Sequence, residues 1–496
     1  MNSYFESLGR FATHNPNKIA LSFHQDGAST VVRYGELWRD IDREAVSARA
    51  SRRGELEIIS SRTGYGTILT YLSALRNGAY PAYLAPLTAR QDAQIFHSEL
   101  SQLIERFRPN RVIADTFDPA RLHSLPFGDV DEPGLVQFSS GTTGLRKGIF
   151  ISERHLLAQL AALGTQLGIN AEDRIACWLP LYHDMGLISS LLLPLYFGAS
   201  VAYLDPVEWS FRPESLLALV HSERTTVCWQ PDFAFRHIAN RYARAGVLPE
   251  SRLDSLRLLI NCSEPCRTRT FVDFWHRFRG LGLREDALQV SYGMAEIVFA
   301  ATVTAFNSER EWLSDPEYLS SGRPLPGTAA RIADGGSAEQ PGEIEVQGEC
   351  LFAGYLRHPD PREVFSGGWF RTGDLGFVRE RELYVVGRKD DTLIVNGRKI
   401  LAYQVEDHVG LQKGVRPGRV LCIVSTGGTA VDILYEGEEL DVENLRRIRQ
   451  WCATAAGASV NRILNLEPGI IVKSSSGKVA RAKSIEKLAR LGLLGS

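Results

Sequence analysis

Long apolar runs, an excess of charge of one sign and a dense set of cysteines are all missing from this 496-residue sequence. The most apolar region, residues 187–204, is interrupted by serine, proline and glycine, so it is too broken to span a membrane. The formal net charge is −2, which excludes a basic field that would hold nucleic acid or an anionic membrane by charge alone. The seven cysteines are odd in number and scattered, which indicates reduced thiols rather than a disulfide framework.

Targeting signals and internal repeats are also missing. Residues 1–20 have neither the basic start nor the apolar core of a signal peptide, and no repeat of solenoid length is visible. Cys262 and Cys266 lack a second pair at metal-ligand spacing, which favours two partly buried thiols over a metal site. We therefore expect a cytoplasmic globular protein without a membrane span or a nucleic-acid partner and, at this length, with more than one domain.

What the sequence does contain is a regular alternation of helical and strand-like segments in its first half. Helical periodicity occurs at residues 34–51, 66–78 and 153–168. Short apolar runs bounded by turn residues predict buried strands at residues 55–60, 79–86, 111–115, 135–140, 174–180, 201–205, 225–230 and 256–262. Such alternation is typical of a layered α/β fold with a largely parallel sheet.

The pattern changes near residue 321, where short strands and glycine-bearing turns predict a small β-rich subdomain. The charged stretch GRKDD at 387–391 is the best candidate for a domain boundary, and the residues behind it hold their own strands and helices. We therefore predict an N-terminal domain of residues 1–388, made of layered α/β subdomains plus the β-rich subdomain. A small α+β C-terminal domain would comprise residues 389–496.

The stretch SSGTTGLRKG at 139–148 concentrates hydroxyls, glycines and two cations directly after a predicted strand. Such a loop can turn backbone N–H groups and hydroxyls toward phosphate oxygens, and Gly141 and Gly144 permit backbone angles that other residues avoid. It is not a Walker P-loop, because Lys147 is followed by Gly148 instead of serine or threonine. The composition by itself fits either a phosphate loop or a flexible, hydroxyl-rich turn.

Five further stretches favour the phosphate loop. They are WLPLYHDMG (178–186), SYGMAE (291–296), RTGDLG (371–376), GRKDD (387–391) and KSSSGKVAR (473–481). Together with SSGTTGLRKG, in this order and over nearly the whole chain, they resemble the motifs of the adenylate-forming superfamily. That superfamily includes acyl-CoA synthetases, peptide-synthetase adenylation domains and luciferases. In detail, WLPLYHDMGLI, WQPDFAF and LLINCSEP are most similar to the fatty acyl-AMP ligases.

The resemblance implies a reaction that needs ATP and Mg²⁺, in which a carboxylate attacks the α-phosphate and gives an acyl-adenylate and pyrophosphate. Both reactants are anions, so the site must supply positive charge. The residues implied to bind ATP are Ser139, Ser140, Gly141, Thr142, Thr143, Gly144, Lys147, Ser263, Glu264, Pro265, Ser291, Tyr292, Gly293, Met294, Asp374 and Arg388.

Particular roles follow from the same resemblance. Glu296, with Thr142, would hold Mg²⁺, a hard cation that prefers oxygen ligands. Asp374 would accept hydrogen bonds from both ribose hydroxyls, and Arg388 would reach the ribose or a phosphate. Lys478 is the first choice for a catalytic group, because the corresponding lysine contacts the substrate carboxylate and the α-phosphate.

The implied acyl pocket contains Tyr182, His183, Asp184, Met185, Gly186, Gln230, Asp232 and Phe233. His183 is also a catalytic candidate near the acyl carboxylate. A structural role, as a buried histidine whose hydrogen bonds are made within the protein, explains it almost as well. Asp184 could pair with an amino group, as an acidic residue does in amino-acid-activating relatives. At the positions of Gln230 and Asp232, the family more often has glycine or proline and asparagine. A short, aryl or unusual acid therefore stays open as the substrate beside a long fatty acid.

The resemblance further implies a second step and a moving domain. Asp390 lies at the implied hinge, on which the mobile C-terminal domain turns between adenylation and thioester formation. The favoured acceptor is the phosphopantetheine thiol of an acyl or peptidyl carrier protein. Three alternatives stay open, namely an acyl-CoA ligase that uses free CoA, a stand-alone amino-acid adenylation enzyme and a non-catalytic nucleotide binder.

Overall fold

The chain, seen in a computed structural model, divides into two compact units. Unit 1 comprises Met1–Ser139, Lys147–Thr372 and Gly376–Val385, and unit 2 comprises Ser140–Arg146, Gly373–Leu375 and Val386–Ser496. The predicted division after residue 388 stays a prediction. The structure describes residues 3–25, 27–47, 51–88, 93–115, 117–121, 132–139, 146–245, 251–304, 318–333, 335–338, 340–358, 363–473 and 479–494.

The largest sheet of unit 1 has nine strands in the order β15-β14-β13-β12-β11-β9-β10-β1-β2. Its six inner strands run parallel, and the edge strands pair antiparallel. The strands are β1 (Ile19–Gln25), β2 (Ala28–Arg33), β9 (Arg174–Cys177), β10 (Ser200–Leu204), β11 (Val227–Gln230), β12 (Leu258–Asn261), β13 (Leu288–Gly293), β14 (Ala300–Val303) and β15 (Arg323–Pro324). Strands covered on both faces are mainly apolar, which is why β10, β11 and β12 are buried at every position and do not alternate between buried and exposed residues.

The order of the strands reverses at β9. From β9 the chain crosses to β10 on one side and then returns to β11 on the other side of β9. The first crossover contains the π-helix η1 (Met185–Leu192) and α6 (Leu193–Phe197), and the second contains α7 (Pro206–Phe211) and α8 (Ser215–Glu223). In open α/β sheets, ligands bind outside the carboxyl ends of the strands at such a switch point. The carboxyl ends of β9 and β11 are therefore the expected position of a ligand.

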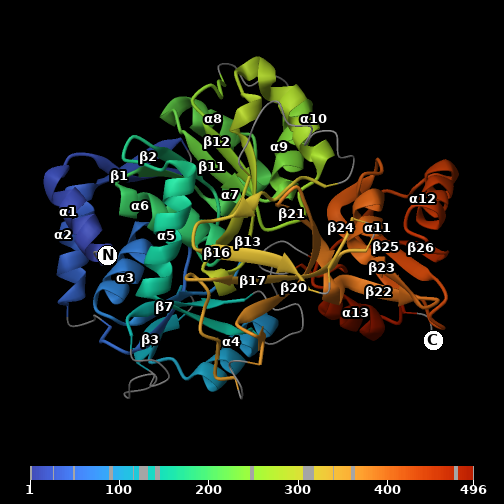
Figure 1. Cartoon of the computed structure of the whole chain (residues 1–496), viewed down its shortest axis with the longest axis horizontal. Coiled ribbons are helices and arrows are strands. Elements are labelled where there is room, and N and C mark those ends of the chain that lie inside the picture. The colour runs from blue at the N-terminus through green and yellow to red at the C-terminus, as the bar shows by residue number, and fades with distance from the viewer. Residues whose placement is uncertain are drawn as a thin grey trace. The chain divides into compact units, whose positions relative to one another are not determined.

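The helices predicted at 34–51, 66–78 and 153–168 are present, and the predicted α/β fold is confirmed. Helices α1, α2 and α3 pack side by side, and α5 packs on α6 (Figure 1). The other helices of unit 1 are α1 (Tyr4–His14), α2 (Tyr34–Ala45), α3 (Tyr65–Arg76), α4 (Ala93–Phe107), α5 (Glu153–Leu167), α9 (Asp232–Ala245) and α10 (Thr268–Phe278), with 3-10 turns η2 (Arg279–Leu281), η3 (Glu285–Ala287) and η4 (Ala295–Ile297).

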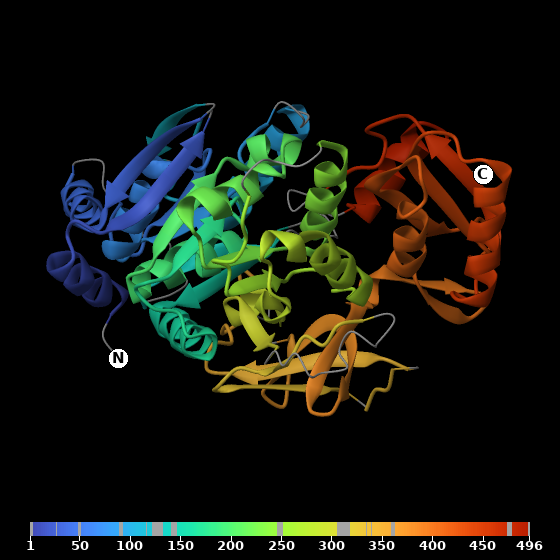
Figure 2. The ribbon, with the colours of Figure 1, turned by 90° about the horizontal axis from the view of Figure 1, so that it is seen from above.

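Besides the large sheet, the described part of unit 1 contains three smaller sheets. Their orders are β4-β3-β5-β6, β18-β8-β7 and β16-β17-β20-β19, with β21 paired to β20. The last of them is formed by the β-rich segment predicted after residue 321, and its yellow and orange strands form a layer of their own (Figure 2). Their bounds are β3 (Leu56–Ser60), β4 (Tyr80–Tyr83), β5 (Arg111–Ala114), β6 (Phe117–Arg121), β7 (Gly134–Phe138), β8 (Gly148–Ser152), β16 (Thr328–Ile332), β17 (Gly342–Gly348), β18 (Tyr355–Leu356), β19 (Phe365–Ser366), β20 (Trp369–Arg379) and β21 (Glu382–Arg388).

In its described residues, unit 2 contains a three-stranded sheet, a hairpin and three α-helices. The sheet has the order β24-β25-β26, and its buried strands pack on the helices through an apolar core of their own. The elements are η6 (Lys389–Asp391), β22 (Thr392–Val395), β23 (Arg398–Leu401), α11 (Ala402–Gly410), β24 (Val415–Val424), β25 (Val431–Gly437), α12 (Val442–Thr454), β26 (Val460–Leu466) and α13 (Arg481–Arg490).

The cysteines behave as the sequence predicted. All seven are buried and unbridged, and burial raises the thiol pKa of Cys262 to about 12. They therefore stay protonated near neutral pH and pack as small apolar side chains. Among the described helices, none combines the length and the apolar character that crossing a membrane requires.

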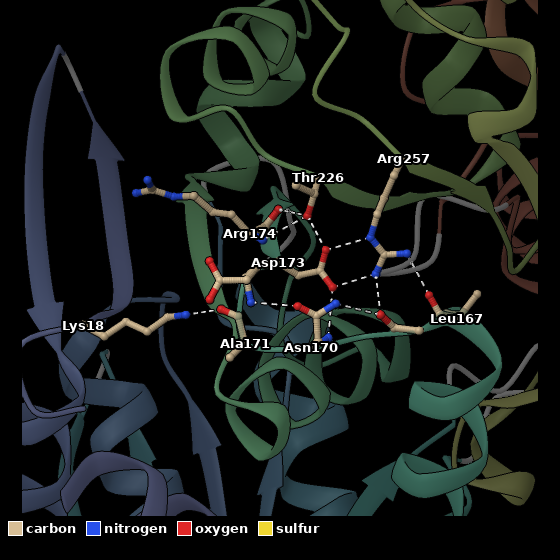
Figure 3. Close-up of polar contacts among 10 residues, drawn as sticks. Lys18, Leu167, Asn170, Ala171, Asp173, Arg174, Thr226 and Arg257 are labelled. Atoms are coloured by element: carbon tan, nitrogen blue, oxygen red, sulfur yellow. Dashed lines mark hydrogen bonds and ion pairs between the residues drawn. The ribbon is translucent and has the colours of Figure 1, made fainter. Parts of the chain in front are cut away.

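A polar network holds the amino ends of three parallel strands together (Figure 3). The carboxylate of Asp173, just before β9, accepts hydrogen bonds from Arg257 Nε and Nη2 at 2.8 and 2.6 Å. It also accepts one from Thr226 Oγ1 at 2.7 Å, and Arg257 Nη1 donates to Leu167 O at 2.8 Å. Because Thr226 and Arg257 directly precede β11 and β12, this network aligns the three strands at the edge of the sheet opposite the expected ligand position.

Replacing Asp173 with asparagine is expected to lower the free energy of unfolding of unit 1 by about 2–3 kcal/mol near neutral pH. Breaking a fully buried pair costs ~3–5 kcal/mol, but the Arg257 side chain is still 32% exposed, so water recovers part of the loss. Urea unfolding followed by tryptophan fluorescence measures this, because of the eight tryptophans only Trp451 lies in residues 386–496.

The effect of this substitution should depend on pH. Burial opposes ionisation of Asp173, but hydrogen bonds from Arg257, Thr226 and the backbone N–H of Asn170 outweigh it and hold the pKa below its usual 3.8. A lowered carboxyl pKa adds stability that is fully present above the unfolded pKa and is lost as the pH falls through the folded one. The difference between wild type and variant should therefore shrink below about pH 4. The exposed Asp254→Asn is the control, with an expected change within about 0.5 kcal/mol; an equal loss in both variants would contradict the assignment.

Candidate active site

The predicted phosphate loop connects two antiparallel strands, β7 and β8, in which Phe138 pairs with Gly148. Ser139 N donates to Lys147 O at 3.0 Å, and Lys147 N donates to Ser139 Oγ at 3.2 Å. These two bonds close the base of the loop and fix where Lys147 leaves it. The loop residues Ser140, Gly141, Thr142, Thr143 and Gly144 lie outside the described residues.

Glu296 lies in the turn η4, directly after the parallel strand β13. Gly293 is required at the end of that strand, because a Cβ there would lie 1.7 Å from Phe299 O. Val298 ends the turn with φ at +68°, a conformation that a β-branched residue rarely adopts. Backbone strain of this kind is concentrated at functional sites. The turn therefore holds the half-buried carboxylate of Glu296 in one defined place.

Tyr355 joins Glu296 to the base of the phosphate loop. Its hydroxyl donates to Glu296 Oε1 at 2.7 Å, and Lys147 Nζ lies over its ring, 4.5 Å from the centroid. Strand β18 places it there, because Tyr355 pairs with Ile149 of β8. Sequence reasoning missed Tyr355, since an aromatic residue in the short stretch AGYL is too common a signal to single out.

The donors in this cluster suit a metal that is bound together with phosphates. Glu296 supplies carboxylate oxygen, and Lys147 places a cation over the ring of the tyrosine that binds this carboxylate. Within the described part of the chain, no group of three or more His, Cys, Asp or Glu side chains could hold a metal by itself. Mg²⁺ usually takes one or two protein carboxylates and completes its shell with water and substrate phosphates. The residues present therefore fit Mg²⁺ that arrives with a nucleotide.

The predicted pocket segment runs into the π-helix η1. Asp184 caps this helix by accepting a hydrogen bond from Met185 N at 2.8 Å. A Cβ on Gly186 would lie 2.3 Å from a backbone oxygen of the preceding turn, so only glycine fits there. The rings of Tyr182 and His183 meet edge to face at 4.6 Å. π-Helical segments are rare and frequently occur at functional sites.

The segment after β12 links the predicted ATP residues to the pocket. Glu264 Oε2 accepts a hydrogen bond from Phe233 N at 3.0 Å, in the first turn of α9. The carboxylate of Asp184 lies close enough to Cys262 to add to the rise in its thiol pKa that burial causes. Residues 262–264 therefore lie beside both predicted pocket segments.

The remaining predicted ATP-binding residues of unit 1 support these segments. Ser263 and Pro265 flank Glu264, and Ser263 has φ at +75°. Ser291 Oγ donates to Thr302 O at 2.9 Å, which ties β13 to β14. Tyr292 is buried and Met294 is half-buried.

Asp232, a predicted pocket residue, has its carboxylate engaged by neighbouring side chains. It accepts hydrogen bonds from Asn261 Nδ2 at 3.0 Å and Thr270 Oγ1 at 3.2 Å, and it forms an ion pair with Arg236 at 3.3 Å. These contacts tie the start of α9 to β12 and α10. Gln230, two residues earlier, is fully buried at the carboxyl end of β11.

In unit 2, the two residues predicted to reach the ribose form an ion pair, with Arg388 Nε 3.1 Å from Asp374 Oδ1. Asp390, the predicted hinge residue, is exposed in η6. Lys478 lies outside the described residues. The structure does not test the roles of these residues, which stay predictions.

Arg481 is a second residue that sequence reasoning passed over, although it closes the quoted KSSSGKVAR stretch. It forms ion pairs with Glu406 at 2.9 Å and with Asp391 at 3.5 Å. Asp391 follows the predicted hinge residue Asp390, and Arg481 follows Lys478 by three positions. The pair therefore ties the predicted hinge to the predicted lysine loop within unit 2.

Comparison with known proteins places these observations in a family. Residues 8–356 match the family described as AMP-binding enzyme. The chain is 28% identical to the long-chain-fatty-acid–AMP ligase FadD23 of Mycobacterium tuberculosis over 90% of each chain. It is 26% identical to the medium-chain-fatty-acid–[acyl-carrier-protein] ligase JamA of Moorena producens, over 78% of this chain and 72% of JamA. A solved structure from a study of fatty acyl-adenylate ligases of E. coli and L. pneumophila matches 99% of both chains with a TM-score of 0.84 at 22% identity, which shows a shared fold.

Proposed function

The chain belongs to the AMP-binding enzyme family, and we propose from this membership that it uses ATP to convert a carboxylic acid to an acyl-adenylate and pyrophosphate. It is an acid–AMP ligase by type. In a second step, the acyl group would pass to the phosphopantetheine thiol of a carrier protein. The observation that carries the proposal is the cluster of Lys147, Tyr355 and Glu296, which brings a cation and a carboxylate from three distant segments to the base of the phosphate loop.

Each residue of this cluster has a task in the first step. Lys147 would neutralise phosphate charge together with the hydroxyls and N–H groups of residues 139–144. Glu296 would hold Mg²⁺, which when bound neutralises charge on the phosphate oxygens. Tyr355 keeps the Glu296 carboxylate in place through its hydrogen bond. Together they lower the repulsion between two anions that must react.

The remaining roles complete the proposal. Asp374 and Arg388 would bind the ribose, and His183 would lie near the acyl carboxylate. Lys478 would reach the α-phosphate from a mobile domain of residues 389–496, which turns at Asp390. The ion pairs of Arg481 support this part, because they couple the residue next to the hinge with the end of the lysine loop.

The carrier protein is favoured as the acceptor by one comparison. JamA is named as a ligase that acts on an acyl carrier protein, and that relative matches this chain over most of its length. Free CoA is the alternative acceptor, and an amino acid is the alternative substrate.

A screen of carboxylic acids for ATP–pyrophosphate exchange tests the first step. The panel contains alkanoic acids of increasing length, aryl acids, hydroxylated acids and amino acids. We expect exchange that depends on the acid and on Mg²⁺. Exchange with no acid in the panel would refute the proposed activity.

The acceptor is tested with the best acid from that screen. Phosphopantetheinylated carrier proteins and free CoA are offered in parallel, and the acylated product is detected by mass spectrometry. We expect an acylated carrier and a far lower rate with CoA. Thioester formation with CoA and with none of the carriers would assign the chain to the CoA ligases instead.

A further inference from the structure

Gln230 carries a side-chain amide that the rest of the described chain leaves unpaired. It is fully buried, and within the described residues neither Nε2 nor Oε1 has a hydrogen-bond partner. Its main chain is paired in the ordinary way, since its carbonyl accepts a hydrogen bond from Cys262 N at 3.2 Å. A buried polar group without a partner is costly, and folded proteins contain few of them. An amide left unpaired at both ends therefore indicates a partner from outside the chain.

Two neighbours of Gln230 share this property. The register of β11 and β12 pairs Gln230 with Asn261, and paired residues of parallel strands point to the same face of the sheet. Asn261 Nδ2 is bound to Asp232, but its Oδ1 is buried without a partner among the described residues. On the other side, the register of β11 and β9, continued beyond Cys177, places Trp178 beside Gln230. The Trp178 indole Nε1 is also buried and unpaired in the described part of the chain.

These groups lie where a ligand is expected from topology. Gln230 and Trp178 stand at the carboxyl ends of β11 and β9, the two strands between which the strand order reverses. Trp178 stacks on Trp209 with ring centroids 3.4 Å apart and meets Phe233 edge to face at 6.1 Å. Polar groups without partners, set among aromatic rings, are typical of a small-molecule site, in which few polar groups fix the orientation of the ligand.

We propose that the acid activated by this chain carries a hydroxyl group in its acyl part, and that Gln230 recognises this hydroxyl. The inference rests on the proposed acid-activating function, because it names the substrate class of that site. A hydroxyl both donates and accepts, so it can accept from Gln230 Nε2 and donate to Gln230 Oε1. An unsubstituted alkyl chain leaves both atoms unpaired, and burying polar groups without partners costs free energy.

A recognition site of this kind has a measurable signature. A site built to hydrogen-bond a substrate hydroxyl rejects the analogue that lacks it, because the buried polar groups then stay unpaired. An apolar pocket discriminates far less against an added hydroxyl. The preference within matched pairs of acids therefore distinguishes the two kinds of pocket.

The experiment compares kcat/KM for ATP–pyrophosphate exchange within matched pairs. The pairs are 3-phenylpropanoic acid with its 4-hydroxyphenyl analogue, and octanoic acid with its 3-hydroxy and 8-hydroxy derivatives. In the wild type, at least one hydroxylated acid should exceed its unsubstituted partner by about 10²-fold or more. In Gln230→Leu, this preference should fall at least about tenfold, because kcat/KM for the hydroxylated acid drops when its hydrogen-bond partner is removed.

Thermal unfolding gives a second readout and guards against misfolding. Gln230→Leu replaces an unpaired amide by an apolar side chain, so the free variant should be at least as stable as the wild type. The added stability that the preferred acid gives in the presence of ATP and Mg²⁺ should be lost. Thr225→Val is the matched control, because Thr225, two residues before the same strand, is fully buried and its Oγ1 has no partner among the described residues. It should leave the preference unchanged.

Two results would overturn this inference and leave the proposed function standing. One is exchange that favours the unsubstituted acid in every pair, and the other is a hydroxyl preference that Gln230→Leu leaves intact. The latter would indicate that a water molecule satisfies the amide. Exchange with no acid at all would remove the proposed function and this inference together, so the two failures are distinguishable.

Discussion

Glu296→Gln is expected to reduce kcat for acid-dependent ATP–pyrophosphate exchange on the order of 10²–10³-fold. Glutamine keeps the shape and an oxygen that can accept the Tyr355 hydrogen bond, but it removes the charge that would hold Mg²⁺ in the proposed role. Charge neutralisation by a metal contributes several kcal/mol, and each tenfold in rate corresponds to about 1.36 kcal/mol. The measurement is steady-state exchange over a range of Mg²⁺ concentrations. The variant should also need more Mg²⁺ for half-maximal rate.

Tyr355→Phe is the matched control for this prediction. It removes one hydrogen bond to the Glu296 carboxylate and keeps the aromatic ring under Lys147. A hydrogen bond to a charged group is worth about 1.5–3 kcal/mol, and only part of it acts on the reaction, so we expect a loss of about tenfold. Wild-type rates and unchanged Mg²⁺ dependence in Glu296→Gln would exclude Glu296 as the metal-binding residue.

Lys478→Ala is expected to slow adenylate formation about 10²–10³-fold with little change in the KM for ATP. If the ammonium group binds the substrate carboxylate and the α-phosphate more strongly in the transition state than in the ground state, its removal lowers kcat rather than affinity. Pyrophosphate release in a single turnover measures this step directly. Nucleotide binding by calorimetry should remain, which separates an enzyme from a protein that only binds nucleotide.

Lys487→Ala is the control for Lys478→Ala. Lys487 lies in α13, and its Nζ donates to Gly469 O at 2.9 Å on an exposed surface. Removing it takes away the same charge from the same stretch of unit 2, and the rate should stay within about twofold of the wild type because exposed charges contribute little. Equal losses in both lysine variants would indicate a general effect of charge and would count against a specific role for Lys478.

Several features of the protein were accessible from local sequence. The largely apolar runs at β10, β11 and β12 predicted buried parallel strands, because strands covered on both faces are mainly apolar. The helix at 153–168 was predicted by its period and begins and ends where its capping residues lie, Ser152 and Gly168. The glycines at 186 and 293 were noted only as parts of motifs, and the structure shows why a side chain is excluded there.

Other features depend on pairing between distant segments, which local sequence does not encode. Tyr355 reaches Glu296 because β18 pairs with β8, and Arg481 reaches Asp391 because unit 2 folds its last helix back on its start. In each case a single residue type is too common to predict a contact. The π-helix at Met185–Leu192 was not predicted either, since an apolar run fits several helical forms.

The sequence by itself determined the fold class and the family, because both follow from the types and order of residues along the chain. The periodicity of apolar residues predicts the helices and strands, and the six motifs can be identified from their residue types and order without knowing the structure. The tertiary structure decided which groups meet and which are left unpaired, as with the bond between Tyr355 and Glu296 and the isolated amide of Gln230. The physical reason is that strand order and register are fixed by the packing of the whole unit, so partners and orphaned groups are defined only after the chain has folded.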